Sequence, residues 1–157
     1  MNQSTRQRSQ IQRLLCGAAL VIGCLIGSKT SADALEKHFI NPASGYTQVV
    51  AVESNGTTTL YVSGQVSTGD TVEVQLRGVF DALRLQVKAG GGELTDIVRI
   101  NTYIVNYQPE QLAVFKRVRD EFFPAENRPA STLVGVTGLA LPEYRVEIDA
   151  IAVFESK

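Results

Sequence analysis

The feature that most constrains the fold of this 157-residue chain is a change in the spacing of apolar residues between residues 70 and 122. A first stretch repeats them every three or four residues and stops at a run of glycines, which predicts an amphipathic helix over about 70–89. Asp70 followed by Glu73 is a capping-box pair that favours this start. The apolar face of the helix consists of Val72, Leu76, Val79, Phe80, Leu83 and Val87.

Residues 97–105 then alternate in side-chain character, which is typical of a strand that is buried on one face. Val98, Ile100, Thr102 and Ile104 are predicted to point one way, and Arg99, Asn101, Tyr103 and Val105 the other. Helical spacing returns after Pro109, a residue tolerated in a first helical turn, and Pro124 ends this second helix. Its buried stripe is predicted to be Leu112, Phe115, Val118 and Phe122.

Further strands are predicted on either side of this segment. Two β-rich stretches near 47–53 and 57–63 flank Asn55-Gly56, a pair that readily adopts the positive φ angles of a tight hairpin turn. Two more strands are expected near 131–137 and 144–154, joined by a loop that contains Pro142. The order β-β-α-β-α-β-β predicts an α+β domain in which both helices cover one face of a single sheet.

The uncovered face of such a sheet needs a partner. The alternation in the last strands makes Leu133, Ile151 and Val153 candidates for this face. Because an exposed apolar patch usually marks an interface, we expect an oligomer whose sheets pack together, with clefts between the subunits.

The N-terminal segment has the plan of an export signal. The first 32 residues contain no acidic residue, and three arginines precede an apolar run of about 14 residues, shorter than the ~20 that a membrane-spanning helix needs. Ala32-Asp33-Ala34 fits ordinary cleavage, which divides the chain into a signal peptide, 1–34, and a domain, 35–157. Alternatively, Val21-Ile22-Gly23-Cys24 resembles a lipoprotein box, and an organellar transit peptide is a third option. We therefore expect a periplasmic or secreted protein, attached to a membrane only if it is lipidated at Cys24.

Residue types in the domain exclude several chemistries. Both cysteines, Cys16 and Cys24, lie in the leader, so the domain has no thiol nucleophile or cysteine-based metal site. His38 is the only histidine, which excludes a Ser-His-Asp set and a histidine-rich metal centre. Removing the leader takes away four of the 15 basic residues and one of the 16 acidic ones, leaving a net charge of about −4. A nucleic-acid partner is therefore not expected, because phosphate binding favours a basic face.

Three places could carry chemistry, and each also has a structural interpretation. Ser63, Gly64 and Gln65 end a strand where a hydroxyl and backbone amides could face a ligand, or they simply form a turn. Glu147 lies among apolar neighbours in the last strand, where a raised pKa would let it transfer protons or orient water; pairing with a cross-strand cation is as common. Ser131 and Thr132 offer hydroxyls at a strand start, although small residues there often serve packing.

Taken together, these stretches resemble the Rid family of reactive-intermediate deaminases, also called YjgF proteins and earlier described as endoribonucleases (L-PSP) or translation inhibitors. The shared segments are YVSGQVS at 61–67, the helix ending in AGGGELTDIVRINTYI, FKRVRDEFF, and RPASTLVGV followed by LPEYRVEIDAIAV. The resemblance implies a fold like that of chorismate mutase and a homotrimer with three intersubunit clefts. In the enzymatic branch, these clefts hydrolyse enamines and imines such as 2-aminoacrylate to 2-keto acids and ammonia, without a cofactor or metal.

The resemblance also implies roles for particular residues. Tyr46 matches the pocket tyrosine, Ser63 and Gly64 match the loop at the cleft, and Glu147 matches the acid that positions water. Gln65, Thr132 and Leu133 border these positions and are further candidates for ligand binding.

The chain departs from the family pattern at the start of its next-to-last strand. Catalytic members have an arginine two residues after the proline of this strand, and its guanidinium binds the substrate carboxylate through two hydrogen bonds. In this chain Ser131 occupies that position, and Lys116 replaces an asparagine common in the second helix of catalytic members. Arg128 could supply the missing charge or could belong only to the preceding turn. We therefore expect a small-molecule-binding homotrimer without efficient 2-imino acid deaminase activity, with a working enamine or imine deaminase as the alternative, and a protein that acts through surface contacts as a third class.

Overall fold

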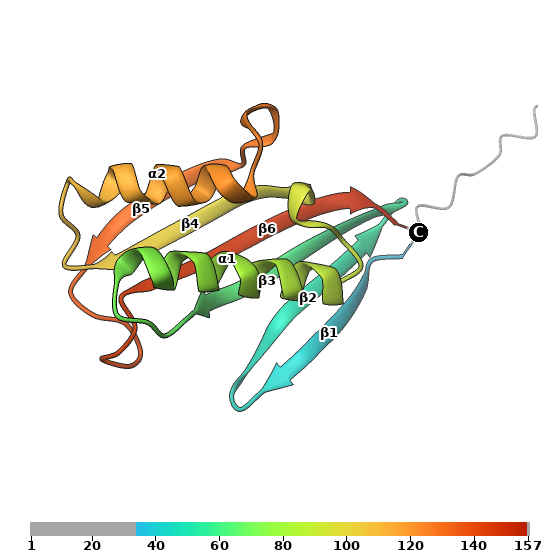
Figure 1. The fold of residues 1–157 in the computed structure, drawn as a ribbon. Coiled ribbons are helices and arrows are strands. Elements are labelled where there is room, and N and C mark those ends of the chain that lie inside the picture. The colour runs from blue at the N-terminus through green and yellow to red at the C-terminus, as the bar shows by residue number, and fades with distance from the viewer. Residues whose placement is uncertain (1–33, 157) are drawn as a thin grey trace, which may run out of the picture. The chain divides into compact units, whose positions relative to one another are not determined.

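The computed structural model describes residues 34–156, so the predicted leader, its cleavage motif up to Asp33 and its two cysteines lie outside the described residues. Three strands, a helix, a strand, a second helix and two final strands follow one another along the chain (Figure 1). Two short 3-10 turns precede β4 and β5. The elements are β1 (Glu36–Ala43), β2 (Tyr46–Ser54), β3 (Thr57–Val66), α1 (Val72–Ala89), β4 (Ile97–Val105), α2 (Gln111–Phe122), β5 (Ala130–Val136) and β6 (Val146–Glu155).

The strands form one mixed sheet in the order β1-β2-β3-β6-β4-β5. Neighbouring strands are antiparallel except β4 and β5, which are parallel. Both helices cover the same face of this sheet (Figure 1), which confirms the predicted α+β class and the two-layer arrangement. The core lies between the layers. Its largest fully buried side chains include Phe80, Phe123, Leu60, Leu76, Leu83, Ile100, Ile104 and Ile148.

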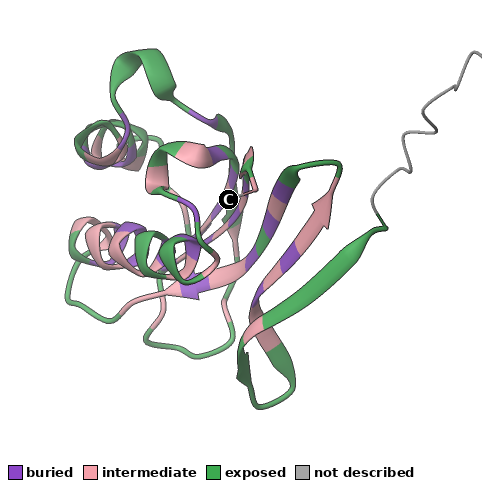
Figure 2. Ribbon diagram, turned by 90° about the vertical axis from the view of Figure 1, so that its right-hand side faces the viewer, coloured by how far each residue is buried: buried purple, intermediate pink, exposed green. Residues whose placement is uncertain are grey.

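The predicted order lacked the first strand, β1. This strand pairs with β2 along the edge of the sheet, and it is exposed over nearly its whole length (Figure 2). Asn41 interrupts it with a φ of 52°, and the strand pairing resumes at Pro42 in the same register. Because an exposed edge strand with a left-handed residue and a proline buries no continuous apolar face, its sequence carries little of the alternation that identifies a strand.

The turn between β2 and β3 is the one that Asn55-Gly56 predicted. Asn55 has a φ of 51° and Gly56 a φ of 73°, the two successive positive angles that a tight hairpin turn requires. This turn fixes the register that pairs Val50 with Tyr61 and Val49 with Val62.

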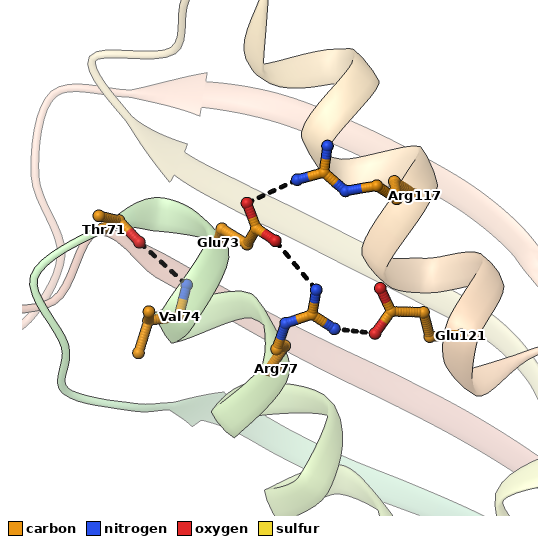
Figure 3. Close-up of polar contacts among 6 residues, drawn as sticks. All are labelled: Thr71, Glu73, Val74, Arg77, Arg117 and Glu121. Carbon is orange, nitrogen blue, oxygen red and sulfur yellow. Dashed lines mark hydrogen bonds and ion pairs between the residues drawn. The ribbon is translucent and has the colours of Figure 1, made fainter.

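The start of α1 differs from the prediction. The N-cap is Thr71, whose Oγ1 accepts a hydrogen bond from the backbone N–H of Val74 at 3.2 Å (Figure 3), so the predicted capping box at Asp70 is wrong. The Glu73 carboxylate instead accepts from Arg77 on its own helix and from Arg117 on α2, and Arg77 also pairs with Glu121 (Figure 3). These ion pairs join the two helices along their outer side.

Two of the predicted apolar faces each include one residue that is exposed in the structure. In β4, a register irregularity between Ile97 and Arg99 turns Ile97 into the core and leaves Val98 exposed. In α2, Leu112 is exposed, and the buried residues are Phe115 and Val118. The aromatic contact with α1 comes from the end of the helix, where Phe122 and Phe123 lie with ring centroids 5.1 and 5.8 Å from that of Phe80.

The face of the sheet opposite the helices is open in the single chain. Ile151 and Val153 lie on it as predicted, because their neighbours Ala150 and Ala152 are buried on the helix side. Leu133 does not: it pairs with the buried Thr102 and packs against the core, so it belongs to the helix side. We call this face, carrying Phe39, Val50, Tyr61, Tyr103, Val134, Ile151 and Val153, the open face.

Candidate functional site

The centre of the candidate site is the carboxylate of Glu147, which lies directly against the backbone of Gly64. A Cβ atom added to Gly64 would lie 2.6 Å from Cδ of Glu147 and would overlap its Oε1. The contact arises because β3 is irregular between Val62 and Gln65, which brings the bulged residues next to the start of β6. The structure thus brings together two of the residues that the sequence singled out, and a side chain at position 64 would displace the carboxylate from this position.

Ser63 and Gln65, on either side of Gly64, use their side chains to shape the bulge. The Ser63 hydroxyl donates to the carbonyl of Thr47 at 2.7 Å. The buried Gln65 donates through Nε2 to the Ser63 carbonyl at 2.9 Å and to Oε1 of Gln48 at 2.8 Å. These bonds tie β3 to β2, so the Ser63 hydroxyl has a structural partner in the single chain.

Tyr46 lies at the first residue of β2, next to the turn after β1. Its side chain is exposed, and its phenolic oxygen accepts a hydrogen bond from Nε2 of Gln48 at 3.1 Å. Gln48 is the same residue that accepts from Gln65, so a chain of hydrogen bonds runs from Tyr46 to the bulge that contacts Glu147.

Strand pairing adds three polar residues of the open face that the sequence analysis did not single out. Tyr103 on β4 pairs with Glu147 on β6, and Asn101 pairs with Asp149. The amide of Asn101 donates to Oδ1 of Asp149 at 2.8 Å. The alternation of side chains shows which residues share a side of one strand. It does not show that β4 pairs with β6, and only this pairing brings Tyr103 and Asn101 next to Glu147 and Asp149.

The surroundings of Glu147 favour its protonated form. Burial raises the pKa of the Glu147 carboxyl above its usual range, and the negative charge of Asp149 raises it further. The pKa of Tyr103 is also raised, first by the charge of Asp149 and then by burial, by hydrogen bonding to Asp149 and by Glu147, while Arg99 opposes the shift. A half-buried carboxyl that holds its proton above the normal range can act as a general acid or, after ionisation, orient water.

The candidate residues of β5 divide between the two faces of the sheet. Thr132 pairs with Asn101 and lies on the open face with Glu147. Ser131 pairs with the buried Ile100, and Leu133 pairs with Thr102, so both belong to the helix side, and Ser131 is exposed at the start of this edge strand. Within one chain, Thr132 is therefore the only residue of this predicted group that shares a face with Glu147.

Arg128, the basic residue nearest to Ser131 along the chain, is already paired with an acid. Arg128 makes a bidentate ion pair with Asp120, with Nε 3.1 Å from Oδ1 and Nη2 3.0 Å from Oδ2. Asp120 also accepts from Arg119, and hydrogen bonding to Arg119 is the main reason that the pKa of Asp120 is lowered. The geometry thus supports the interpretation that Arg128 belongs to the turn before β5.

Arg99 is a cation on the same face as Glu147, and Arg145 lies two residues before Glu147 at the entry of β6. Arg99 lies four residues before Tyr103 along β4, which is about 13 Å at the rise of an extended strand. Its Nε is 3.5 Å from Oδ1 of Asn101, a marginal hydrogen-bond distance.

A surface cavity of about 410 Å³ opens at the end of the sheet where β6 begins. It is lined by Val105, Tyr144 and the loop residues 137–142, none of which is charged. Arg145 joins it to the site, because its carbonyl accepts from the N–H of Val105 at 2.9 Å and Glu147 follows two residues later. Within residues 34–156 no three His, Asp or Glu side chains are grouped closely enough to hold a metal ion.

Comparison with known proteins gives the class. Residues 36–154 match the family described as endoribonuclease L-PSP. A relative in Dermatophagoides farinae, named 2-iminobutanoate/2-iminopropanoate deaminase, is 32% identical over 122 residues, which cover 73% of this chain and 89% of that protein. The chain therefore belongs to the Rid/YjgF/endoribonuclease L-PSP family.

Solved structures agree with this assignment. A protein of the YjgF/YER057c/UK114 family from Mycobacterium tuberculosis has a TM-score of 0.65 and 25% identity, covering 76% of this chain and all of that chain. A Rid-family protein from Yersinia pestis has a TM-score of 0.58 and 29% identity, covering 75% of this chain and 98% of that chain. Within residues 34–156, neither helix is long and apolar enough to cross a membrane.

Proposed function

We propose that this protein is a homotrimer that binds a small metabolite in the clefts between its subunits and lacks efficient 2-imino acid deaminase activity. The observation that carries the proposal is the serine at position 131, where the catalytic pattern of the family has an arginine, together with the engagement of Arg128 by Asp120. A carboxylate at such a position would lose a charge-assisted pair worth about 1.5–3 kcal/mol, or up to roughly a hundredfold in affinity.

The trimer is supported by the open face. Phe39, Tyr61 and Val153 are 65%, 51% and 37% exposed on it, and Phe39 and Tyr61 have apolar cross-strand partners in Val50 and Ile151. Contiguous apolar surface of this kind is typical of a face that is covered in an assembly, and a closed trimer would cover it with a different patch of the neighbouring subunit.

The acidic domain supports a small-molecule ligand over a nucleic acid, and the leader supports an exported protein. Mass spectrometry of the mature N-terminus separates the three forms of processing. Ordinary export predicts a chain that begins at Leu35, whereas lipidation predicts an acylated Cys24 as the first residue.

The proposal is tested by supplying purified protein with 2-iminopropanoate, generated in place by an amino acid oxidase or a pyridoxal-phosphate enzyme. We expect keto acid to form at the rate of spontaneous hydrolysis, and we expect the Glu147→Ala variant to give the same rate. Formation of keto acid at a rate typical of an enzyme, lost in Glu147→Ala, would contradict the proposal.

That contrary result would establish the second candidate, an enamine or imine deaminase. It is favoured by the name of the relative from Dermatophagoides farinae and by the raised pKa of Glu147 beside Gly64. In this alternative, Glu147 would handle protons and water, Tyr46 would contact the ligand, and Arg99 and Arg145 are candidate cations for a charged substrate.

A further inference from the structure

Gln75 is a polar residue in the second turn of α1 that is completely buried, at 0% exposure. It lies in the helix face that otherwise consists of core residues such as Leu76 and Val79. A buried amide is tolerated only where its donors and acceptor are matched, so the partners of Gln75 show what the side chain does.

All of these partners are backbone groups of two other segments. Nε2 of Gln75 donates to the carbonyl of Gly69 at 3.0 Å and to the carbonyl of Glu143 at 2.9 Å. Its Oε1 accepts from the N–H of Arg145 at 2.8 Å. One side chain thus links the segment that enters α1 to the loop that enters β6.

The loop held by Gln75 leads directly to Glu147. Arg145 is fixed on both sides, because its N–H donates to Gln75 and its carbonyl accepts from Val105 on β4. β6 starts at the next residue, and Glu147 is its second residue. Any shift of this entry would change how closely the Glu147 carboxylate lies against Gly64, where there is no room for even one more carbon atom.

We propose that Gln75 is a positioning residue, which fixes the entry of β6 and thereby holds the Glu147 carboxylate against the β3 bulge. The inference rests on the proposed site at Glu147 but not on whether the protein turns over an imine. It assigns to α1, which contributes no side chain to the open face, a role in setting the environment of the acid.

A residue with only a structural role would change stability without changing the environment of Glu147 in the folded protein. The test therefore follows the titration of the Glu147 carboxyl carbon by NMR in the full domain. The charged or titratable groups near this carboxyl are Asp149 and Arg145, each two residues from Glu147 along the chain, and Tyr103 on β4, with Arg99 farther along β4. Gln75→Met replaces none of these side chains. Gln86→Met is the matched control: it lies on the same helix, and its Oε1 accepts only from Asn41 on β1 among the bonds described.

We expect Gln75→Met to lower the pKa of Glu147 toward the value of an exposed glutamate, about 4.3, because the carboxylate becomes more accessible to water. Gln86→Met should leave the titration unchanged. A folded Gln75→Met protein with the wild-type titration of Glu147 would overturn the inference. If Gln75→Met does not fold, Gln75→Asn, which keeps the amide but is too short to reach all three partners, is read by the same criterion. An absence of deaminase activity leaves this test intact, and an unchanged titration leaves the proposed function intact.

Discussion

At the scale of single residues, the candidate site depends on the contact between the backbone of Gly64 and the carboxylate of Glu147. Gly64 supplies the space, and Glu147 fills it with a carboxylate whose pKa is raised by burial and by Asp149. The sequence identified both residues, since Glu147 stands among apolar neighbours and Gly64 ends a predicted strand. The sequence could not identify their contact, because the two residues are 83 positions apart along the chain and meet only through the irregular pairing of β3 with β6. No local sequence pattern marks this irregularity.

Gly64→Ala tests this contact. The added methyl group would displace the Glu147 carboxylate, so we expect weaker ligand binding and a loss of about 1 kcal/mol in the free energy of unfolding, the low end for overpacking because the carboxylate can rotate away. Gly138→Ala is the control, because no atom lies within 4 Å of a Cβ placed there. Chemical denaturation of both variants measures the difference. Equal effects at the two glycines would mean that the carboxylate does not occupy this position in solution.

Glu147→Gln tests the direction of the pKa shift through stability. Because the pKa of Glu147 is raised in the folded protein, the folded state holds this proton more tightly than the unfolded chain does. The free energy of unfolding therefore falls as the pH rises from the unfolded value, about 4.3, through the higher folded value. The glutamine variant does not titrate, so it should gain stability relative to the wild type at pH 7 compared with pH 3.

Urea denaturation at the two pH values measures this gain. Glu155→Gln, an exposed position at the end of the same strand, serves as the control for a general effect of charge. A stability difference between Glu147→Gln and the wild type that is the same at pH 3 and pH 7 would contradict a raised pKa.

At the scale of elements, apolar spacing predicted the type and order of both helices and of five of the six strands. The strand that it missed, β1, is an exposed edge with little apolar alternation. The faces were less certain than the elements: one irregularity in β4 exchanges the positions of Ile97 and Val98. The start of α1 shows the same limit, because Asp70 and Thr71 are both good caps in sequence, and only the bond from Val74 to Thr71 decides between them.

The two helices are also joined on their outer side. Glu73, Arg77, Arg117 and Glu121 form ion pairs between α1 and α2 (Figure 3), and all four side chains are more than a third exposed. Exposed pairs of this kind contribute little individually, about 0–1 kcal/mol. The packing of Phe80 against Phe122 and Phe123 is therefore the main link between the helices, and it keeps α2 over β4 and β5.

At the scale of the whole molecule, the open face determines whether the site is complete. Tyr46 and Glu147 are connected within one chain only through Gln48 and Gln65, and Ser131 lies on the other side of the sheet. A cleft that used all of them would need the edges and faces of more than one subunit. The proposed trimer would therefore account for the separation of these residues in a single chain, although their strands were correctly predicted.

Val153→Asp tests the assembly. A charge on the open face should prevent sheets from packing together, so we expect the variant to elute as a monomer while the wild type elutes as a trimer. Leu85→Asp is the control, since Leu85 is also apolar and exposed, at 65% against 37% for Val153, but lies on α1. Light scattering coupled to gel filtration gives both masses. A trimeric Val153→Asp protein would show that this face is not the interface.

The absence of a guanidinium at position 131 is the central claim, and restoring it is the most direct measurement. The rate of keto acid formation from 2-iminopropanoate is compared between the wild type and Ser131→Arg, each checked for an unchanged mass in gel filtration. We predict a wild-type rate equal to spontaneous hydrolysis and a faster rate in Ser131→Arg, with a gain in carboxylate affinity of up to roughly a hundredfold. An enzymatic rate in the wild type that Ser131→Arg leaves unchanged would contradict the account.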